Sequence, residues 1–184
     1  MPNELRNSLG ETGTMEAVSS QDFVDKHLHI SEGGCLGICA KFMAEFKNPF
    51  VTEQDYLEAA QWVQSGPEPQ ERVDLLAEAA GLRKVETYEG QLLTDEIYLT
   101  HFLGRAIAKP TSFTVFGFVN TARNHGHALL LYKWGDDWYL FDPNFGHAKW
   151  PHAGALMLGL KRLLRSAAYR RYGPFYRFKA IRYE

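Results

Sequence analysis

Three side chains capable of acyl-transfer chemistry occur in the order cysteine, histidine, aspartate along this chain of 184 residues. Cys35 follows two glycines, His127 lies in an apolar stretch, and Asp142 comes fifteen residues after the histidine. A thiolate can attack a carbonyl carbon, an imidazole can carry the proton, and a carboxylate can hold the imidazole in one tautomer. If the fold brings them together, these residues predict a nucleophilic triad.

The segment that carries the histidine and the aspartate has the pattern of a β-hairpin. Residues 126–134 are apolar and strand-like, and residues 135 and 136 are the two-residue turn signal Gly-Asp. Residues 137–141 are rich in aromatic side chains, as a second strand would be. This hairpin is therefore the element that must position both groups.

The register of the hairpin puts the two groups on one face. A two-residue turn pairs Trp134 with Asp137, so Asp142 lies opposite Leu129, and His127 lies two residues further along on the same face. Diagonal neighbours of this kind are roughly 7–8 Å apart at Cα and somewhat closer at Cβ. That separation allows an imidazole–carboxylate hydrogen bond.

A second histidine on this face is too distant to take the same role. His125 pairs with Gly146, which lies about 13 Å beyond Asp142 at the usual strand rise. The hairpin therefore selects His127, although a three-residue turn would reverse the faces and undo this prediction. Asp-Pro-Asn at residues 142–144 is also a turn sequence, so Asp142 could serve a turn and a triad together.

The cysteine lies at the start of a predicted buried helix. Apolar side chains recur after it at helical spacing, at Leu36, Cys39, Phe42, Met43 and Phe46. We expect this helix to begin near Cys35 and to end near Asn48 and Pro49. The unpaired amides and the macrodipole at a helix N-terminus favour a thiolate, and the preceding glycines leave the backbone open to an oxyanion. Cys39, one turn further on the apolar face, is predicted to be buried core.

These features carry a resemblance to a known family. The matching stretches are Gly34-Cys35-Leu36-Gly37-Ile38, Gly126-His127-Ala128 and Phe141-Asp142-Pro143-Asn144-Phe145-Gly146. They resemble the YopT/AvrPphB group of papain-like cysteine proteases (peptidase family C58), which are bacterial effectors delivered into host cells. The resemblance implies Cys35 as nucleophile, His127 as general base and then general acid, and Asp142 as the group that orients His127. It also implies a host protein as substrate and no metal or organic cofactor.

The sequence departs from the family pattern at two points. The interval between Cys35 and His127 is shorter than the family leads us to expect, so the intervening helical part is trimmed. The family also has a polar side chain, usually asparagine, five residues before the cysteine, where it completes the oxyanion hole. Ile30 occupies that position here. His29, Ser31 or backbone amides could replace it, and the second oxyanion donor stays unassigned.

Other functions could use the same residues. A glutamine deamidase effector or a peptidoglycan amidopeptidase would form the same acyl-thioester, so the sequence does not separate them from a protease. A catalytically inactive adaptor is a different class, and it predicts a buried, unreactive Cys35. A zinc site would join His125, His127 and His147 to the cysteine. The sequence has no CxxC or HExxH motif to support it, so no metal is expected.

Charge is unevenly distributed along the chain, although the net charge is only −2. Residues 50–96 contain eleven acidic and three basic side chains, whereas nine basic side chains and one acidic side chain follow residue 142. This asymmetry predicts an acidic helical lobe and a basic C-terminal lobe. The basic lobe could bind an anionic membrane surface or an acidic partner, and because nothing specifies bases, no nucleic acid is expected.

The N-terminal segment bears on domain organisation and location. We predict a flexible leader over residues 1–20 and a single papain-like catalytic domain over residues 21–184. The leader has no apolar signal region, and two cysteines on one helix give no disulfide framework, which fits a reducing cytosol. With the family resemblance, this predicts secretion from a bacterial cytoplasm without a cleaved signal peptide and action in the cytosol of a host or target cell.

The remaining pattern predicts helices before the hairpin and strands around it. Helices are expected over residues 21–28, 53–64, 71–80, 95–108 and 151–171, and further strands over residues 112–120 and 175–183. Thr52 and Asp55 form a capping-box pattern, and Gly81 fits a helix C-terminus. The order predicts an α+β, papain-like fold, in which N-terminal helices, including the cysteine helix, pack against a C-terminal antiparallel sheet.

Overall fold

The computed structural model describes residues 14–16, 34–46, 48, 50–90, 111–120, 125–144, 146–166, 169 and 177–184. The helices are α3 (Gly34–Ala44), α4 (Glu53–Gln64), α5 (Pro69–Ala79) and α7 (Ala153–Arg165). The strands are β1 (Thr14–Glu16), β2 (Lys84–Gly90), β3 (Phe113–Asn120), β4 (His125–Trp134), β5 (Asp137–Asp142), β6 (Gly146–Trp150) and β7 (Arg177–Tyr183).

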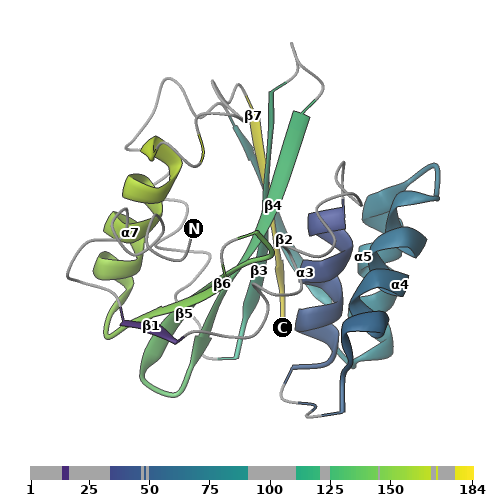
Figure 1. Ribbon diagram of the computed structural model, residues 1–184, viewed down its shortest axis with the longest axis horizontal. Helices are drawn as coiled ribbons and strands as arrows, with labels where there is room; N and C mark the ends of the chain where they lie inside the picture. Colours follow the sequence, from purple (N-terminus) through teal and green to yellow (C-terminus); the bar gives the residue numbers. More distant parts are fainter. Residues whose placement is uncertain are drawn as a thin grey trace.

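The seven strands form one antiparallel sheet in the order β1-β6-β5-β4-β3-β7-β2. Helices α3, α4 and α5 lie on one side of this sheet, and α7 lies on the other (Figure 1). The arrangement confirms the predicted α+β class, with the cysteine helix packed against the sheet. It differs from the prediction in that β2 precedes the other large strands and joins the sheet at its far edge.

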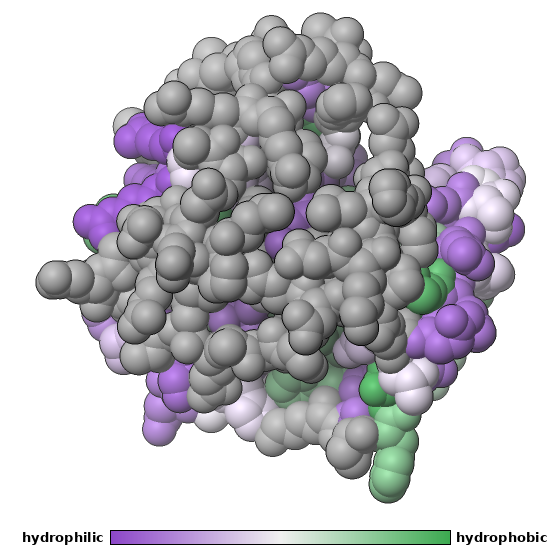
Figure 2. Space-filling model, in the orientation of Figure 1, coloured by the Kyte–Doolittle hydropathy of each residue, from purple (hydrophilic) through white to green (hydrophobic). Residues whose placement is uncertain are grey.

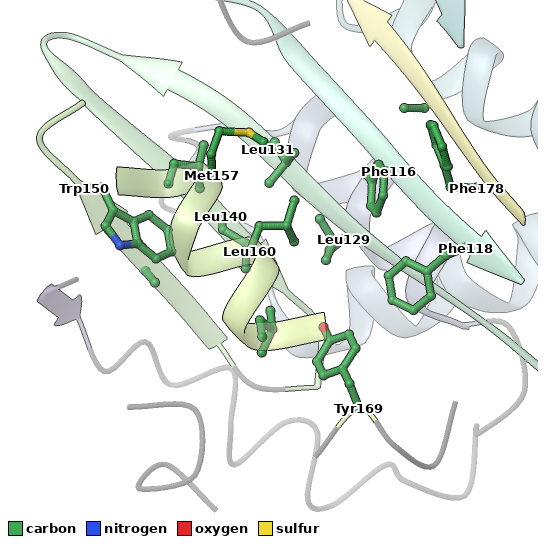
Figure 3. Close-up of a cluster of buried hydrophobic side chains, with 14 of the residues drawn as sticks. Phe116, Phe118, Leu129, Leu131, Leu140, Trp150, Met157, Leu160, Tyr169 and Phe178 are labelled. Atoms are coloured by element: carbon green, nitrogen blue, oxygen red, sulfur yellow. The ribbon is translucent and has the colours of Figure 1, made fainter. Parts of the chain in front are cut away.

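Alternation along the central strands divides the core between the two faces of the sheet. On β4, Leu129 and Leu131 belong to the cluster around α7, whereas Ala128 and Leu130 belong to the cluster around α3. Figure 3 shows the first cluster, in which Leu160 of α7 lies against the sheet. The odd or even position of a strand residue therefore decides which helical layer its side chain meets.

The predicted two-residue hairpin turn is confirmed. Gly135 has a φ of +58°, and Trp134 pairs with Asp137, followed by four further pairs along β4 and β5. Glycine suits this turn because it adopts positive φ without steric cost. The register that was inferred from the turn is therefore present, and His127 lies on the α7 face with its ring centroid 5.6 Å from that of Phe118.

Local capping signals place the ends of α4 and α5 near the predicted positions. The Thr52 hydroxyl accepts from the amide of Asp55, and the Asp55 carboxylate accepts from the amide of Thr52 at 2.7 Å, which completes the capping box. α5 begins at Pro69, two residues earlier than predicted, because proline fits the first helical turn. Gly81, just past its end, has a φ of +78°.

The helix that was predicted over residues 151–171 is shorter than expected. α7 ends at Arg165, where Ser166 leaves the helical conformation with a ψ of 161°. The predicted helices over residues 21–28 and 95–108 lie outside the described residues. None of the described helices is long and apolar enough to cross a membrane.

Three strands of the sheet were not predicted from the sequence. β2 carries three charged side chains in seven residues, and β6 has only five residues, so neither shows a clear apolar alternation. β1 lies within the predicted flexible leader, where its three residues pair with β6. That prediction is therefore wrong for residues 14–16, since backbone pairing at a sheet edge does not require apolar side chains.

Opposite charges that are far apart in the sequence meet at the β2–β7 edge. Arg182 contacts Glu86 at 3.1 Å, and Lys179 contacts Glu89 at 3.1 Å. The exposed Lys179–Glu89 pair contributes at most about 1 kcal/mol, whereas Arg182 is buried, and both pairs neutralise charge on the predicted basic lobe. Hydrophilic side chains still cover the two flanks of the view in Figure 2, over α7 and over α4 and α5.

Close packing between α3 and α4 depends on a glycine of the cysteine motif. A Cβ atom added to Gly37 would lie 2.6 Å from the Cα of Ala60 and 2.7 Å from the carbonyl oxygen of Ala59. Both neighbours are backbone atoms of α4, which cannot move aside as a side chain could. Gly37 therefore sets the distance between the two helices.

We expect Gly37→Ala to lower the free energy of unfolding by about 1–3 kcal/mol, because overpacking outweighs the gain in helix propensity. Urea denaturation of the purified variant measures this change. Gly154→Ala in α7 is the matched control, since its added Cβ would meet only the His152 ring at 3.5 Å. A Gly37→Ala protein as stable as the parent chain would contradict the close-packing account.

Candidate active site

The cysteine of the predicted triad lies in the first turn of a helix. α3 begins at Gly34, so Cys35 is its second residue and is partly buried. The first four amides of a helix have no partner within it, and the helix dipole adds positive potential there. This environment favours a thiolate and supplies backbone donors, including the Cys35 amide, for an oxyanion.

The histidine and the aspartate form the hydrogen bond that the hairpin register predicted. His127 Nε2 and Asp142 Oδ1 are 2.9 Å apart, and the Asp142 side chain has no exposed surface. Because Nε2 engages the carboxylate, Nδ1 is the ring nitrogen left for the cysteine. Cys35 Sγ accepts from the amide of Ala128, the residue after His127, so the fold brings the three predicted residues together.

The two cysteines of α3 both contact the backbone of Ala128 in β4. The Ala128 amide donates to Cys35 Sγ at 3.2 Å, and Cys39 Sγ donates to the Ala128 carbonyl at 3.6 Å. These backbone groups are available because the β4–β5 ladder stops at the Leu130–Phe141 pair. Continuing the register would set Ala128 opposite Pro143, which has no N–H to donate. The end of the ladder thus makes room for the nucleophile.

Electrostatics in the site favour an ion pair between cysteine and histidine. Burial by itself lowers the pKa of His127, but the charges of Asp142 and Cys35 and their hydrogen bonds outweigh it and raise that pKa to about 10. The imidazolium therefore persists through neutral pH and can stabilise a thiolate at Cys35. The Ala128 N–H donates to Cys35 Sγ and also stabilises a negative charge on that sulfur.

Two further residues contact the triad, and sequence reasoning did not assign them a role. The Asn144 amide donates to Asp142 Oδ1 at 2.8 Å, which is the turn that the Asp-Pro-Asn sequence indicated, and its side-chain Nδ2 lies 3.3 Å from His127 Nδ1. The Tyr169 hydroxyl donates to Asp142 Oδ2. Asn144 stood within the family motif, whereas nothing in the local sequence distinguishes Tyr169.

The remaining candidates are placed away from the triad or outside the described residues. Burial, followed by the charges of Cys35 and Asp142, raises the pKa of Cys39 well above its ordinary value, so Cys39 remains a core thiol. His147 stacks on Tyr139 with ring centroids 5.2 Å apart and hydrogen-bonds another tyrosine through Nε2.

The described residues contain no group of three or more His, Cys, Asp or Glu that could hold a metal. His29 and Ser31, which were considered as second oxyanion donors, and Ile30, at the family's donor position, fall outside the described part of the chain, as does the His125 side chain.

Comparison with known proteins identifies the fold that carries this site. No protein-family model and no curated protein matches the sequence. The chain is similar to the crystal structure of the Pseudomonas avirulence protein AvrPphB, with 15% identity, coverage of 91% of this chain and 97% of that chain, and a TM-score of 0.62. It is also similar to PatoxP, a cysteine protease-like domain of the Photorhabdus asymbiotica toxin PaTox, with 12% identity and a TM-score of 0.51.

The PatoxP match covers 96% of this chain but 57% of that structure, so the chain spans little more than half of its length. At these identities, both likenesses establish the fold and leave the activity open. The resemblance predicted from the sequence motifs is confirmed at that level: the chain has the α+β fold of the YopT/AvrPphB type of papain-like cysteine protease.

Proposed function

We propose that this protein is a cysteine protease that cleaves a specific target protein through Cys35, His127 and Asp142. The observation that carries the proposal is the buried imidazole of His127, which bonds a carboxylate through Nε2 and adjoins the backbone amide that holds the Cys35 thiol at a helix N-terminus. A buried structural histidine would not need both partners, nor would it need the cysteine in a helix's first turn.

The chemistry follows from this geometry. The Cys35 thiolate attacks a peptide carbonyl, and the carbonyl π electrons move to oxygen, which accepts hydrogen bonds from the first-turn amides of α3. His127 gives its Nδ1 proton to the leaving amine as the C–N bond breaks. Water then loses a proton to His127 and attacks the thioester, which releases the acid and regenerates the thiolate. Asp142 holds the imidazole throughout.

The biological setting is also part of the proposal. The two similar structures are an avirulence protein and a toxin domain, which supports an effector role. Secretion without a cleaved signal peptide is proposed with that role. Its target would be a protein in the cytosol of a host or target cell. Lys161, Arg162 and Arg165 on α7 could hold the enzyme near an anionic membrane or an acidic partner.

Alkylation of Cys35 tests whether its thiol is activated. We expect iodoacetamide to label Cys35 at pH 6 faster than it labels free cysteine, because the His127 imidazolium stabilises the attacking sulfur. In His127→Ala, the rate at pH 6 should fall at least tenfold and then rise with pH as for an ordinary thiol of pKa about 8.5. Mass-spectrometric peptide mapping assigns the label.

Cys39 serves as an internal control in this experiment, because it is fully buried and should stay unlabelled in the folded protein. Labelling of Cys39 in preference to Cys35, or a Cys35 no faster than free cysteine, would refute the protease proposal. The inactive adaptor would then be the better account.

The variant Asp142→Asn tests whether the negative charge of Asp142, rather than the size of its side chain, supports the His127 imidazolium. The amide keeps the size of the side chain but removes the charge that raises the pKa of His127. We therefore expect alkylation of Cys35 at pH 6 to fall by about ten- to a hundredfold. Equal rates in Asp142→Asn and the parent chain would mean that the carboxylate does not support the imidazolium.

A proteome-wide comparison identifies the reaction. Extracts of candidate target cells would be treated with the active protein or with Cys35→Ser, and new N-termini and modified glutamines would be mapped by mass spectrometry. We expect one or a few new N-termini that depend on Cys35. Conversion of a glutamine to glutamate without chain cleavage would favour the deamidase, and release of cell-wall peptides would favour the amidopeptidase.

A further inference from the structure

Tyr169 reaches the triad from the layer opposite to Cys35. It lies beyond the end of α7, it has no exposed surface, and its hydroxyl donates to Asp142 Oδ2. Its ring lies 5.7 Å from the Phe118 ring and 5.7 Å from the His127 ring, edge to face with the latter. Figure 3 shows it at the end of the apolar cluster, beside Phe118.

The Asp142 carboxylate needs this donor because it is completely buried. Its Oδ1 accepts from His127 Nε2 and from the Asn144 amide, and its Oδ2 accepts from Tyr169. A carboxylate that is buried without hydrogen-bond partners is strongly destabilised, so each donor helps to keep the group in place.

The donor on Oδ2 also controls orientation. The terminal torsion of an aspartate has broad minima, so donors on one oxygen alone allow the carboxylate to swing about that oxygen. A third donor on the other oxygen fixes the plane of the carboxylate. Oδ1 is then held toward His127 Nε2, and Nδ1 is held toward Cys35.

We propose that Tyr169 is a positioning residue of the triad, whose hydroxyl orients Asp142 and through it His127. The proposal rests on the proposed cysteine hydrolase function and adds a fourth member to its hydrogen-bond chain. Because Tyr169 is buried, it does not touch the substrate, and its loss should lower turnover while leaving substrate affinity unchanged.

The chain contains a matched control on the other face of the sheet. Tyr183 also has no exposed surface, and its hydroxyl donates to a carboxylate, that of Asp74, at 2.6 Å. Asp74 also pairs with Lys84 and has no part in the triad. Tyr183→Phe therefore removes the same kind of hydrogen bond as Tyr169→Phe and keeps the ring in place.

The first measurement is the rate of Cys35 alkylation at pH 6 in the two phenylalanine variants. We expect about a tenfold loss in Tyr169→Phe, the effect of losing one hydrogen bond to a charged group, and the parent rate in Tyr183→Phe. Once a peptide substrate is identified, Tyr169→Phe should lower kcat and leave KM unchanged. A similar loss in both variants would indicate general loosening and overturn the assignment.

The second measurement does not depend on catalysis. In a Cys35→Ser background, proton NMR of protein with ¹⁵N-labelled histidine follows the His127 Nε2–H that faces Asp142. We expect Tyr169→Phe, and not Tyr183→Phe, to speed exchange of this proton with water by about tenfold, because the carboxylate is less firmly held.

Together, the two measurements distinguish failure of the protease proposal from failure of the positioning role. If the parent Cys35 is unreactive but Tyr169→Phe speeds the exchange of the histidine proton, the positioning role stands and the protease proposal fails. If that proton exchanges at the parent rate in Tyr169→Phe, the positioning role is refuted, whatever the reactivity of Cys35.

Discussion

The buried hydrogen bond between His127 and Asp142 is the interaction on which the site depends. It exists because the hairpin turn has two residues, which puts the imidazole and the carboxylate on the same face of β4 and β5. One more residue in the turn would carry the imidazole to the opposite face. Without Asp142 beside it, burial would favour a neutral imidazole, and the thiol would lose its charged partner.

The point where β4 and β5 separate positions the nucleophile, as the hairpin turn positions the histidine. A sheet normally uses every backbone amide and carbonyl of a central strand, which would leave none for a cysteine from a helix. Here the ladder stops before Pro143, so the amide of Ala128 bonds Cys35 and its carbonyl bonds Cys39. The strand end thus anchors the helix that carries the thiol, in addition to carrying the histidine.

The parts of this site that could be predicted from the sequence are governed by local rules. The glycine in the turn, the alternation along the hairpin and the helical spacing after Cys35 each act over a few residues, and together they selected His127 and Asp142. β2 and β6 escaped prediction because their pairing with distant strands, rather than their composition, makes them strands.

Tyr169 is the clearest case of a residue that sequence patterns could not find. It follows a segment that resembles an ordinary amphipathic helix, and the predicted helix ran past it. Its contact with Asp142 joins residues 27 positions apart and depends on how α7 packs on the sheet. The meeting of basic β7 with acidic β2 was hidden for the same reason, since only the sheet order brings them together.

The two faces of the sheet contribute different parts of one site. Cys35 arrives with the α3 layer and contacts a residue 93 positions away, and Tyr169 lies with the α7 layer. Both layers must dock before the thiol meets a charged imidazole, so chemical competence is a property of the finished fold alone. In an unfolded chain, Cys35 would have neither the amide of Ala128 nor the imidazole of His127 beside it.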